Sequence, residues 1–387
     1  MNEILILGAG YAGMSATLGL AARLQNRDDV HITLVNPQTR FLERLRLHQA
    51  AAGQALADLQ IPDRLAGTGV DFACGWVTGI DADARTVRID DTTTLHYDTL
   101  VYALGGVADT ADVPGVDEFA FTLNSAQDAA LLARHLERLP GGAPVVVAGG
   151  GLTGVESAAE IAERHPDLDV TLVSREIPAA VMGERARARV HRGLERLGVR
   201  IRSGAAIVKV TPDAVALDDG SMVPAQAVLW TAGIRVSPLA AAAGLQVDER
   251  GRIVTDEYLR SVSHPDVYAV GDAAAVRQGY GVMHGTCQAG ISMALHTAIN
   301  ITRSLKSKQP RRFRFGYFHQ PVSLGRRDAV VQYTRADDSP APLYLAGRPA
   351  AVYKETVSSS PWMLFRLLTA VPALGPLLWR RGGRRTR

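Results

Sequence analysis

Cysteine is nearly absent from this sequence, which has only Cys74 and Cys287 among its 387 residues. Two cysteines cannot build a disulfide framework or a zinc cluster, so no structural metal is expected. The first residues, Met1-Asn2-Glu3-Ile4, contain no basic stretch, and no small-residue cleavage site is recognisable. No signal peptide is therefore predicted, and a reducing, cytoplasmic location is expected.

An excess of one charge sign is also missing from most of the chain. The last eight residues hold five arginines and no acid, and without them the chain has 37 basic and 39 acidic residues. The net charge of +3 therefore belongs to the tail. A basic tail behind an apolar stretch indicates an anionic membrane surface rather than a nucleic-acid groove, so no nucleic-acid partner is predicted.

The rest of the composition is that of a globular protein. Hydrophobic residues make up 47% and charged residues 21% of the chain. These values exclude a disordered chain, a collagen-like repeat and a coiled coil. The length allows two or three domains.

A strand, a glycine-rich turn, a helix and a second strand open the chain. The strand at residues 4–7 runs into GAGYAG (8–13), then a helix to about Leu24 and a strand at 32–35. The order recurs with a strand at 145–148, GGGLTG (149–154), a helix to about Arg164 and a strand at 170–173. Such glycines permit a tight turn and let a pyrophosphate approach the helix N-terminus. Two copies predict two dinucleotide sites.

Two short strands that end in small residues flank the second pattern. They are LVYALG (residues 100–105) and VLWTAG (228–233). We interpret them as the points where the chain passes between two domains, with linkers at Pro114-Gly115 and residues 236–244.

The last third of the chain carries one more motif. VYAVGDAA (residues 267–274) predicts a short strand with Gly271-Asp272 at a helix start, where the carboxylate can accept a hydrogen bond from a polyol. A helix is predicted from about Gly285 to Ile301. Residues 321–324 and 329–333 are predicted as strands. Residues 361–379 are predicted as one or two short apolar helices, broken at Pro372 and Pro376.

In this order and at these separations, GAGYAG, VVVAGGGLTGVE, WTAG and VYAVGDAA resemble the two-dinucleotide-domain FAD/NAD(P)-dependent pyridine nucleotide oxidoreductases. The sequence is most similar to their type II NADH dehydrogenase (NADH:quinone oxidoreductase) branch. The resemblance implies an α/β fold with two Rossmann-like domains. It implies a discontinuous FAD-binding domain (residues 1–113 and 245–310), an inserted NAD(P)H-binding domain (114–244) and a small C-terminal region (311–387).

The resemblance also implies the cofactors, a tightly but non-covalently bound FAD and NADH or NADPH, and the residues that hold them. The residues expected around FAD are Gly8, Gly10, Tyr11, Ala12, Gly13, Asn36, Arg44, Val77, Ala103, Gly105, Gly271 and Asp272. Those expected around NAD(P)H are Gly149, Gly151, Leu152, Thr153, Gly154, Glu156, Ser174, Arg175 and Gly233. Asn36 stands where the family usually has an acid on the adenosine ribose.

The nicotinamide-nucleotide site departs from the NADH pattern at one place. Ser174-Arg175 stand where an NADH enzyme usually has Glu. A carboxylate favours a free 2′-hydroxyl and repels a 2′-phosphate, whereas Ser with Arg does the reverse. This favours NADPH or dual use, and the neighbouring Glu176 keeps NADH open.

The electron acceptor is indicated less completely. Disulfide reductases of this superfamily need a closely spaced cysteine pair, and residues 43–52 hold none. Type II dehydrogenases carry two glutamines one helical turn apart near the quinone. Here Gln288 keeps the first and Ser292 stands at the second, on the same helix face. His48 and His284 are expected near the flavin ring, with His48 as a candidate catalytic acid.

Together these features predict an FAD-dependent NAD(P)H dehydrogenase that passes electrons to a quinone or quinone-like molecule without pumping protons. Two alternatives stay open: a soluble flavin oxidoreductase acting on a quinonoid natural product, and an apoptosis-inducing-factor-like NADH redox sensor. The tail would hold the enzyme peripherally on the inner face of the cell membrane. A homodimer interface, or a helix covering the flavin domain, is the other use expected for residues 361–379.

Overall fold

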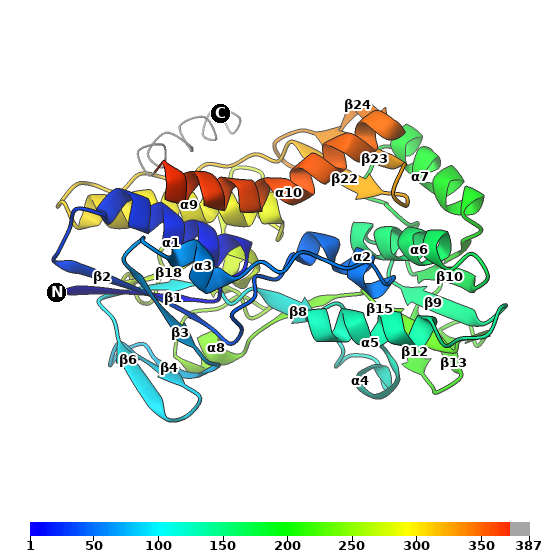
Figure 1. The fold of residues 1–387 in the computed structure, drawn as a ribbon, viewed down its shortest axis with the longest axis horizontal. Helices are drawn as coiled ribbons and strands as arrows, with labels where there is room; N and C mark the ends of the chain where they lie inside the picture. Colours follow the sequence, from blue (N-terminus) through cyan, green and yellow to red (C-terminus); the bar gives the residue numbers. More distant parts are fainter. Residues whose placement is uncertain (372–387) are drawn as a thin grey trace.

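A five-stranded parallel sheet forms the centre of one half of the protein in the computed structural model, which describes residues 1–371 (Figure 1). Ile6 and Leu7 in its central strand are fully buried, as expected where helices and loops cover both faces. Helices α1 (Tyr11–Leu24) and α9 (Cys287–Ser304) pack together against this sheet. The strand order is β18 (Val267–Ala269), β7 (Thr99–Tyr102), β1 (Asn2–Leu7), β2 (Val30–Asn36) and β3 (Val70–Cys74).

A second parallel sheet lies in the other half, at the right of Figure 1. Its valines are fully buried at residues 145–147. The strand order is β11 (Arg200–Ser203), β10 (Asp169–Ser174), β9 (Pro144–Ala148) and β15 (Ala227–Trp230). The accompanying helices are α5 (Ala126–Leu136), α6 (Leu152–Arg164) and α7 (Glu184–Arg196).

The chain crosses between the two halves twice. The crossings lie side by side, because β8 (Gly106–Ala108) pairs with β16 (Ile234–Val236) in antiparallel fashion. The first sheet takes β18 from the chain beyond the second sheet, so the first unit is discontinuous and the second is inserted into it. The predicted fold class is therefore confirmed. The exact domain boundaries stay a prediction.

Smaller elements complete the two halves. Two antiparallel sheets are built from β4 (Val77–Asp81), β5 (Thr86–Ile89) and β6 (Thr93–His96), and from β12 (Ile207–Val210), β13 (Ala214–Leu217) and β14 (Met222–Pro224). Short strands are β17 (Ile253–Val254), β19 (Ala274–Ala275), β20 (Arg277–Gln278) and β21 (Gly281–Val282). Short helices are η1 (Arg44–Arg46), α2 (Leu47–Ala51), α3 (Ile61–Leu65), α4 (Val116–Phe119), α8 (Leu239–Ala242) and η2 (Gly271–Ala273).

The Gly-Asp motif differs from its prediction. Gly271 and Asp272 form a single 3₁₀ turn, η2, rather than the start of a helix. The long helix that follows, α9, begins only at Cys287. Its start is set by Thr286, whose hydroxyl accepts a hydrogen bond from the Ala289 amide at 3.1 Å.

A three-stranded antiparallel sheet and one long helix form the C-terminal region. The sheet contains β22 (His319–Ser323), β23 (Ala329–Thr334) and β24 (Pro340–Ala346), and the helix is α10 (Arg348–Ala370). The predicted strands correspond to β22 and β23, whereas β24 was not predicted. Figure 1 shows α10 running from these strands to the top of α1, so that it bridges both halves of the molecule.

The predicted start of the apolar C-terminal helix at Pro361 is wrong. Helix α10 begins at Arg348 and passes through Pro361. A proline inside a helix costs about 3 kcal/mol. This cost is offset because one buried stripe continues through it: Ala350, Lys354, Ser358, Pro361, Phe365 and Leu368. The predicted breaks at Pro372 and Pro376 lie outside the described residues.

No helix within residues 1–371 is long and apolar enough to cross a membrane. The same residues contain no cluster of three or more His, Cys, Asp or Glu side chains suited to a metal ion.

Candidate functional site

The first glycine turn leaves an open space at the N-terminus of α1. A Cβ atom on Gly13 would lie 1.7 Å from the Gly8 carbonyl oxygen, so this glycine lets the helix pack on the turn. A Cβ on Gly10, the N-cap residue, would meet nothing within 4 Å. No side chain caps α1. Its free N–H groups therefore face a space that suits an anionic group such as a pyrophosphate.

The second glycine turn repeats this geometry at α6. A Cβ on Gly154 would lie 1.9 Å from the Gly149 carbonyl oxygen, whereas a Cβ on Gly151 would meet nothing within 4 Å. Gly151 caps α6 without a side-chain bond, and Thr153 is exposed in the first turn. The two predicted nucleotide turns thus share the same geometry, with packing glycines behind and an open N-terminus in front.

The predicted ribose residue Asn36 also holds the first turn in place. Its Oδ1 atom accepts a hydrogen bond from the Ala9 amide at 2.9 Å, and its Nδ2 atom donates to the Gln38 carbonyl at 2.7 Å. An aspartate could accept the first bond but not donate the second. Asn36 therefore stabilises the turn from the end of β2, and its contact with a ribose stays a prediction.

The Gly-Asp turn lies beside the first glycine turn. A Cβ atom on Gly271 would lie 3.3 Å from the Ala12 Cβ atom. The Asp272 carboxylate makes no hydrogen bond or ion pair among the described residues. Burial raises its pKa, and the nearby Arg44 charge offsets this rise only in part. Arg44 itself donates to the Gly106 carbonyl at 2.8 Å. An unpaired acceptor beside the turn suits the hydroxyl groups of a polyol, such as the ribityl chain of FAD.

Other predicted cofactor residues border this region. Val77 begins β4 and is half-buried, and Ala103 directly follows β7. Gly105 and Gly233 directly precede the paired crossing strands β8 and β16. Their contacts with a cofactor stay predictions.

The two residues predicted to bind the 2′-phosphate, Ser174 and Arg175, differ in their exposure to solvent. Ser174 is buried at the end of β10, and its Oγ atom lies only 2.2 Å from where a Cβ on Gly150 would stand. Arg175 and Glu176 are exposed and make no ion pair among the described residues. Arg175 is thus the residue whose charge is available to a ligand.

The predicted acceptor residues lie in the first turns of α9. Gln288 donates through Nε2 to the His319 carbonyl at 3.0 Å, and its Oε1 atom is buried without a partner. Ser292 is 6% exposed. Gln288 is therefore hydrogen-bonded to the first residue of β22, and its Oε1 atom remains an unpaired acceptor among the described residues. His284 lies in the preceding loop, stacked on Tyr317 at 4.4 Å between ring centres.

Four segments that are distant in the sequence meet in one buried polar cluster. Glu156 from α6 pairs with Lys354 from α10 at 2.9 Å. The amide and hydroxyl of Ser323, at the end of β22, donate to the same carboxylate oxygen at 2.9 and 3.1 Å. His48 from α2 lies 3.9 Å from the other carboxylate oxygen. We call these four residues the junction cluster.

Burial and neighbouring charges shift the pKa values of two members of the junction cluster, His48 and Glu156. Burial lowers the pKa of His48 to about 4 despite the nearby Glu156 carboxylate. His48 is therefore neutral at neutral pH, which does not favour its predicted role as an acid. Burial alone would raise the pKa of Glu156, but the nearby positive charges, chiefly Lys354, and the hydrogen bonds from Lys354 and Ser323 together outweigh it, and the pKa falls below its usual value. The result is a buried carboxylate–ammonium pair.

Two members of the junction cluster, Ser323 and Lys354, were missed in the sequence. Ser323 gives no signal, because its contact with Glu156 depends on where β22 ends. Lys354 gives a weak one: it is one of four lysines among the 42 basic residues of this arginine-rich chain. Lysine changes protonation more readily than arginine, so a rare lysine on a buried helix face suggests chemistry.

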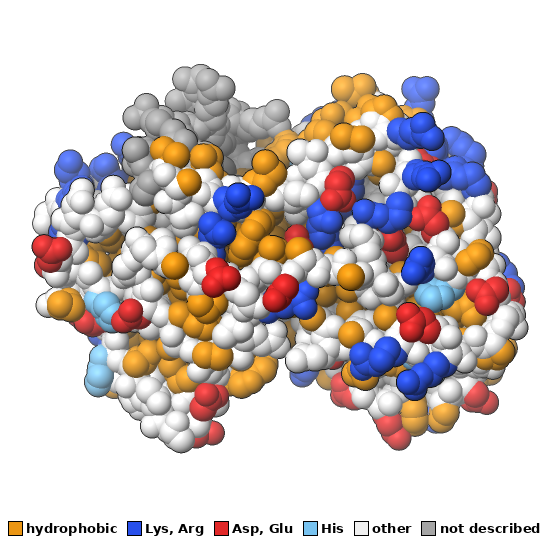
Figure 2. All heavy atoms as spheres, in the orientation of Figure 1, with side chains coloured by type: hydrophobic (Ala, Val, Ile, Leu, Met, Phe, Trp, Pro, Cys, Tyr) orange, Lys and Arg blue, Asp and Glu red, His pale blue; other side chains and the backbone are white. Residues whose placement is uncertain are grey.

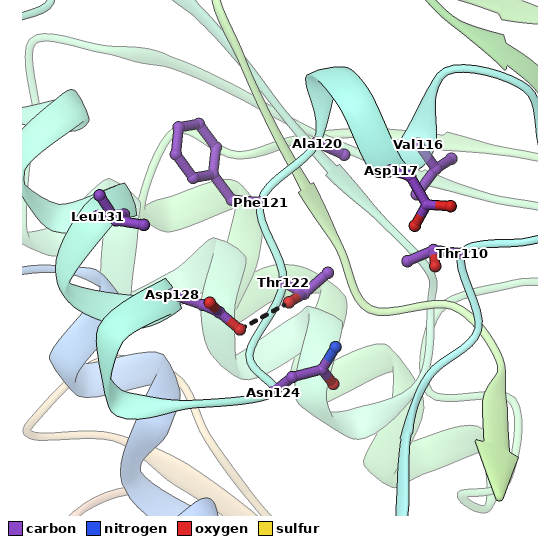
Figure 3. Close-up of a pocket in the computed structure, with 9 residues that line it drawn as sticks. All are labelled: Thr110, Val116, Asp117, Ala120, Phe121, Thr122, Asn124, Asp128 and Leu131. Carbon is purple, nitrogen blue, oxygen red and sulfur yellow. Dashed lines mark hydrogen bonds between the residues drawn. The ribbon is translucent and has the colours of Figure 1, made fainter. Parts of the chain in front are cut away.

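A separate hollow lies in the inserted unit (Figure 3). It has a volume of about 390 Å³, and Asp128 accepts a hydrogen bond from Thr122 at its edge. None of the predicted cofactor or acceptor residues lines it. The hollow is therefore distinct from both glycine turns and from the junction cluster.

Comparison with known proteins agrees with this geometry. The pyridine nucleotide-disulphide oxidoreductase family matches residues 2–300, which include both glycine turns and the Gly-Asp turn. The chain belongs to this family. The two cysteines nevertheless form no disulfide, and they lie far apart in the sequence. This family member therefore carries no closely spaced cysteine pair, as the sequence indicated.

Relatives within this family extend along the whole chain. An NADH dehydrogenase-like protein of Mycobacterium tuberculosis is 31% identical, with 93% of this chain and 94% of the relative covered. A type II NADH:quinone oxidoreductase of Staphylococcus saprophyticus is 28% identical, with 92% and 94% covered. The structure of NDH2 from Plasmodium falciparum in complex with NADH matches with a TM-score of 0.81 at 14% identity, covering 98% and 99%. The resemblance to the type II branch is thus confirmed, and the structural match confirms the fold.

Proposed function

We propose that this oxidoreductase oxidises NAD(P)H through a bound FAD and passes the electrons to a quinone or quinone-like acceptor, without pumping protons. The observation that supports this most directly is the pair of open helix N-termini at Gly10 and Gly151, one in each parallel sheet unit. The names of the whole-length relatives, which include type II NADH:quinone oxidoreductases, support the acceptor class.

The chain's own residues would bind and orient the two cofactors. FAD would supply the redox chemistry, accepting a hydride from NAD(P)H and delivering two electrons onward. The N-termini of α1 and α6 would hold the two pyrophosphates, and Asp272 would accept hydrogen bonds from the ribityl chain. Lys354 and Glu156, which are both buried, would hold a proton at the junction between the two units.

The nicotinamide cofactor proposed is NADPH or either nucleotide. Arg175 supports this proposal because it is exposed, has no carboxylate partner among residues 1–371 and follows the strand that ends beside the second glycine turn. A 2′-phosphate carries negative charge that a free guanidinium can pair with bidentately.

The proposed location is the inner face of the cell membrane, with the basic tail on anionic lipid and the rest of the chain in the cytoplasm. The support is the sequence of residues 372–387, in which apolar residues precede the arginines. Phe365 and Leu368 do not contribute to such a contact, because they are fully buried on the protein, whereas Met363 on the same helix is exposed.

The test is an anaerobic titration of the purified protein. The account predicts one FAD per chain and loss of the visible flavin absorbance with one equivalent of NADH or NADPH. A protein that takes up no flavin, or a flavin that neither nucleotide reduces, would contradict the proposal.

A further inference from the structure

The loop at residues 41–46 lies between the first glycine turn and helix α10. Residues 41–43 belong to no helix or strand, and residues 44–46 form the single 3₁₀ turn η1. A segment outside a sheet or a long helix depends on its side chains and on neighbouring elements for its position. We call residues 41–46 the covering loop. The contacts on its two sides therefore decide where it lies.

The inner side of the covering loop contacts residues that are expected to hold FAD. The Leu45 amide donates to the hydroxyl of Tyr11, in the first glycine turn, at 3.3 Å. Arg44 donates to the Gly106 carbonyl at 2.8 Å, and its charge offsets part of the rise in the pKa of the nearby Asp272 carboxyl. The covering loop thus extends from the first glycine turn to the Gly-Asp turn.

Aromatic rings of α10 pack on the outer side of the covering loop. Phe41 is 2% exposed, and its ring centre lies 5.5 Å from that of Trp362 and 5.5 Å from that of Phe365. The ring of Phe41 also meets Tyr11 edge to face at 5.3 Å. Arg64, on α3, lies over the Trp362 ring at 5.2 Å from its centre. Such contacts depend on ring orientation, so one chain of oriented rings joins α10 to the first glycine turn.

Polar contacts hold the same face of α10 in place. Arg46, in the covering loop, pairs with Glu355 and donates to the Ser359 hydroxyl at 2.7 Å. Arg64 donates to the Thr369 hydroxyl at 3.3 Å. The α10 residues in these polar and aromatic contacts follow one another at intervals of three or four, so they lie on one face of the helix. Figure 2 shows hydrophobic and basic side chains side by side where α10 passes over α1 and α3.

We propose that Trp362 and Phe365 are positioning residues for FAD. They act through Phe41, because they hold the covering loop where Tyr11 and Arg44 meet the cofactor, and FAD release requires this part of α10 to move. This inference rests on the proposed function, which takes the first glycine turn as the FAD site. Binding and packing are then linked: FAD stabilises the packing of α10 by the same free energy by which packed α10 stabilises bound FAD.

The rate at which the holoenzyme releases FAD tests the proposal. The flavin fluorescence, which rises when FAD leaves the protein, is followed after dilution. Trp362→Ala should speed the release about tenfold. Trp362→Phe, which keeps an aromatic ring beside Phe41, should restore most of the slow release. Met363→Ala removes a neighbouring side chain that is 64% exposed and should leave the rate as in the unaltered protein.

A general loss of stability is separated from this effect by a variant in the second unit. Val190 is fully buried on α7, and Val190→Ala leaves a cavity there without touching the covering loop. It should lower the unfolding temperature without speeding FAD release. Trp362→Ala should speed FAD release more than Val190→Ala does, even where the two lower the unfolding temperature equally.

The reverse direction of the linkage is measured by hydrogen exchange of the unaltered protein before and after FAD is removed. The amides of residues 355–369 should exchange faster without FAD, by a larger factor than those of α7. Equal factors, or a release rate unchanged in Trp362→Ala, would overturn the inference and leave the proposed function intact. A protein that binds no FAD at all would defeat both.

Discussion

At the residue scale, substitutions at two glycines of the first turn test cofactor binding and folding separately. Gly10→Val should lower FAD occupancy strongly while leaving the unfolding temperature of the flavin-free protein nearly unchanged, because its side chain enters open space. Gly13→Val should destabilise the flavin-free protein itself, because its side chain meets the Gly8 carbonyl. Absorbance ratios and thermal unfolding of both variants measure this. Full FAD occupancy in Gly10→Val would show that the pyrophosphate does not approach this residue.

The charge of Arg175 provides a second test at this scale. Arg175→Ala should reduce the preference for NADPH over NADH by roughly tenfold, since a lost charge-assisted hydrogen bond is worth about 1–3 kcal/mol. The ratio of the two kcat/KM values measures it. Arg187→Ala, on helix α7, is the matched control. An unchanged ratio in Arg175→Ala would mean that this arginine does not read the 2′-phosphate.

Some residues of the candidate site could be predicted from the sequence, and others could not. Gly10 and Gly151 could be predicted because a glycine turn is a local pattern between a strand and a helix. Lys354 and Ser323 could not, because their contacts with Glu156 arise only where α10 and β22 meet α6. Asn36 was predicted as a ribose contact, and an acid at this position could not donate the hydrogen bond that Asn36 makes to the Gln38 carbonyl.

At the element scale, the buried pair joins helices α6 and α10. Lys354→Met should destabilise the fold by about 3–5 kcal/mol, because Glu156 is left charged and buried. The double variant Lys354→Met with Glu156→Gln should recover part of that loss, because no unpaired charge remains. Thermal unfolding of the single and double variants checks this. Equal destabilisation in both would show that packing, rather than charge, dominates the contact.

A histidine links strands β1, β2 and β3 of the first sheet. On β2, the Nδ1 atom of His31 lies 2.7 Å from the Glu3 carboxylate on β1 and its Nε2 atom 2.8 Å from the Asp71 carboxylate on β3, and these bonds raise the pKa of His31. A raised pKa stabilises the fold below the unfolded value of about 6.5 and loses this effect as the pH rises through the folded pKa. His31→Gln should therefore lower the unfolding temperature at pH 6 more than at pH 9. An equal loss at both values would contradict the ionic contribution.

Helix α10 shows why elements are harder to predict than motifs. Prolines at residues 361, 372 and 376 suggested short broken helices, since a proline removes one backbone bond. The stripe from Ala350 to Leu368 outweighs this local effect by burying one face against the first unit and the C-terminal sheet. Tertiary packing of that kind is not visible in local sequence.

At the scale of the whole molecule, the tail and the folded body are expected to act separately. A chain ending at Val371 should keep its FAD and its nucleotide reduction but lose binding to anionic vesicles. The full chain should bind them more weakly as salt rises, because exposed charges are screened. Co-sedimentation with anionic and neutral vesicles measures this. Equal sedimentation of the two proteins would reject the tail as an anchor.

The order of the whole molecule was largely predictable, because each parallel sheet follows from one strand–turn–helix–strand pattern. The junction cluster was not predictable, because it is formed only when α2, α6, β22 and α10 come together. The acceptor is the part of the account that most needs measurement.

The most direct test is rapid mixing of the anaerobically reduced protein with a naphthoquinone. The account predicts that the visible flavin absorbance returns within one turnover time and that one quinol forms per flavin. A flavin that stays reduced in the presence of quinones, while NADH changes the oligomeric state of the protein, would contradict electron transfer to a quinone and favour a redox sensor.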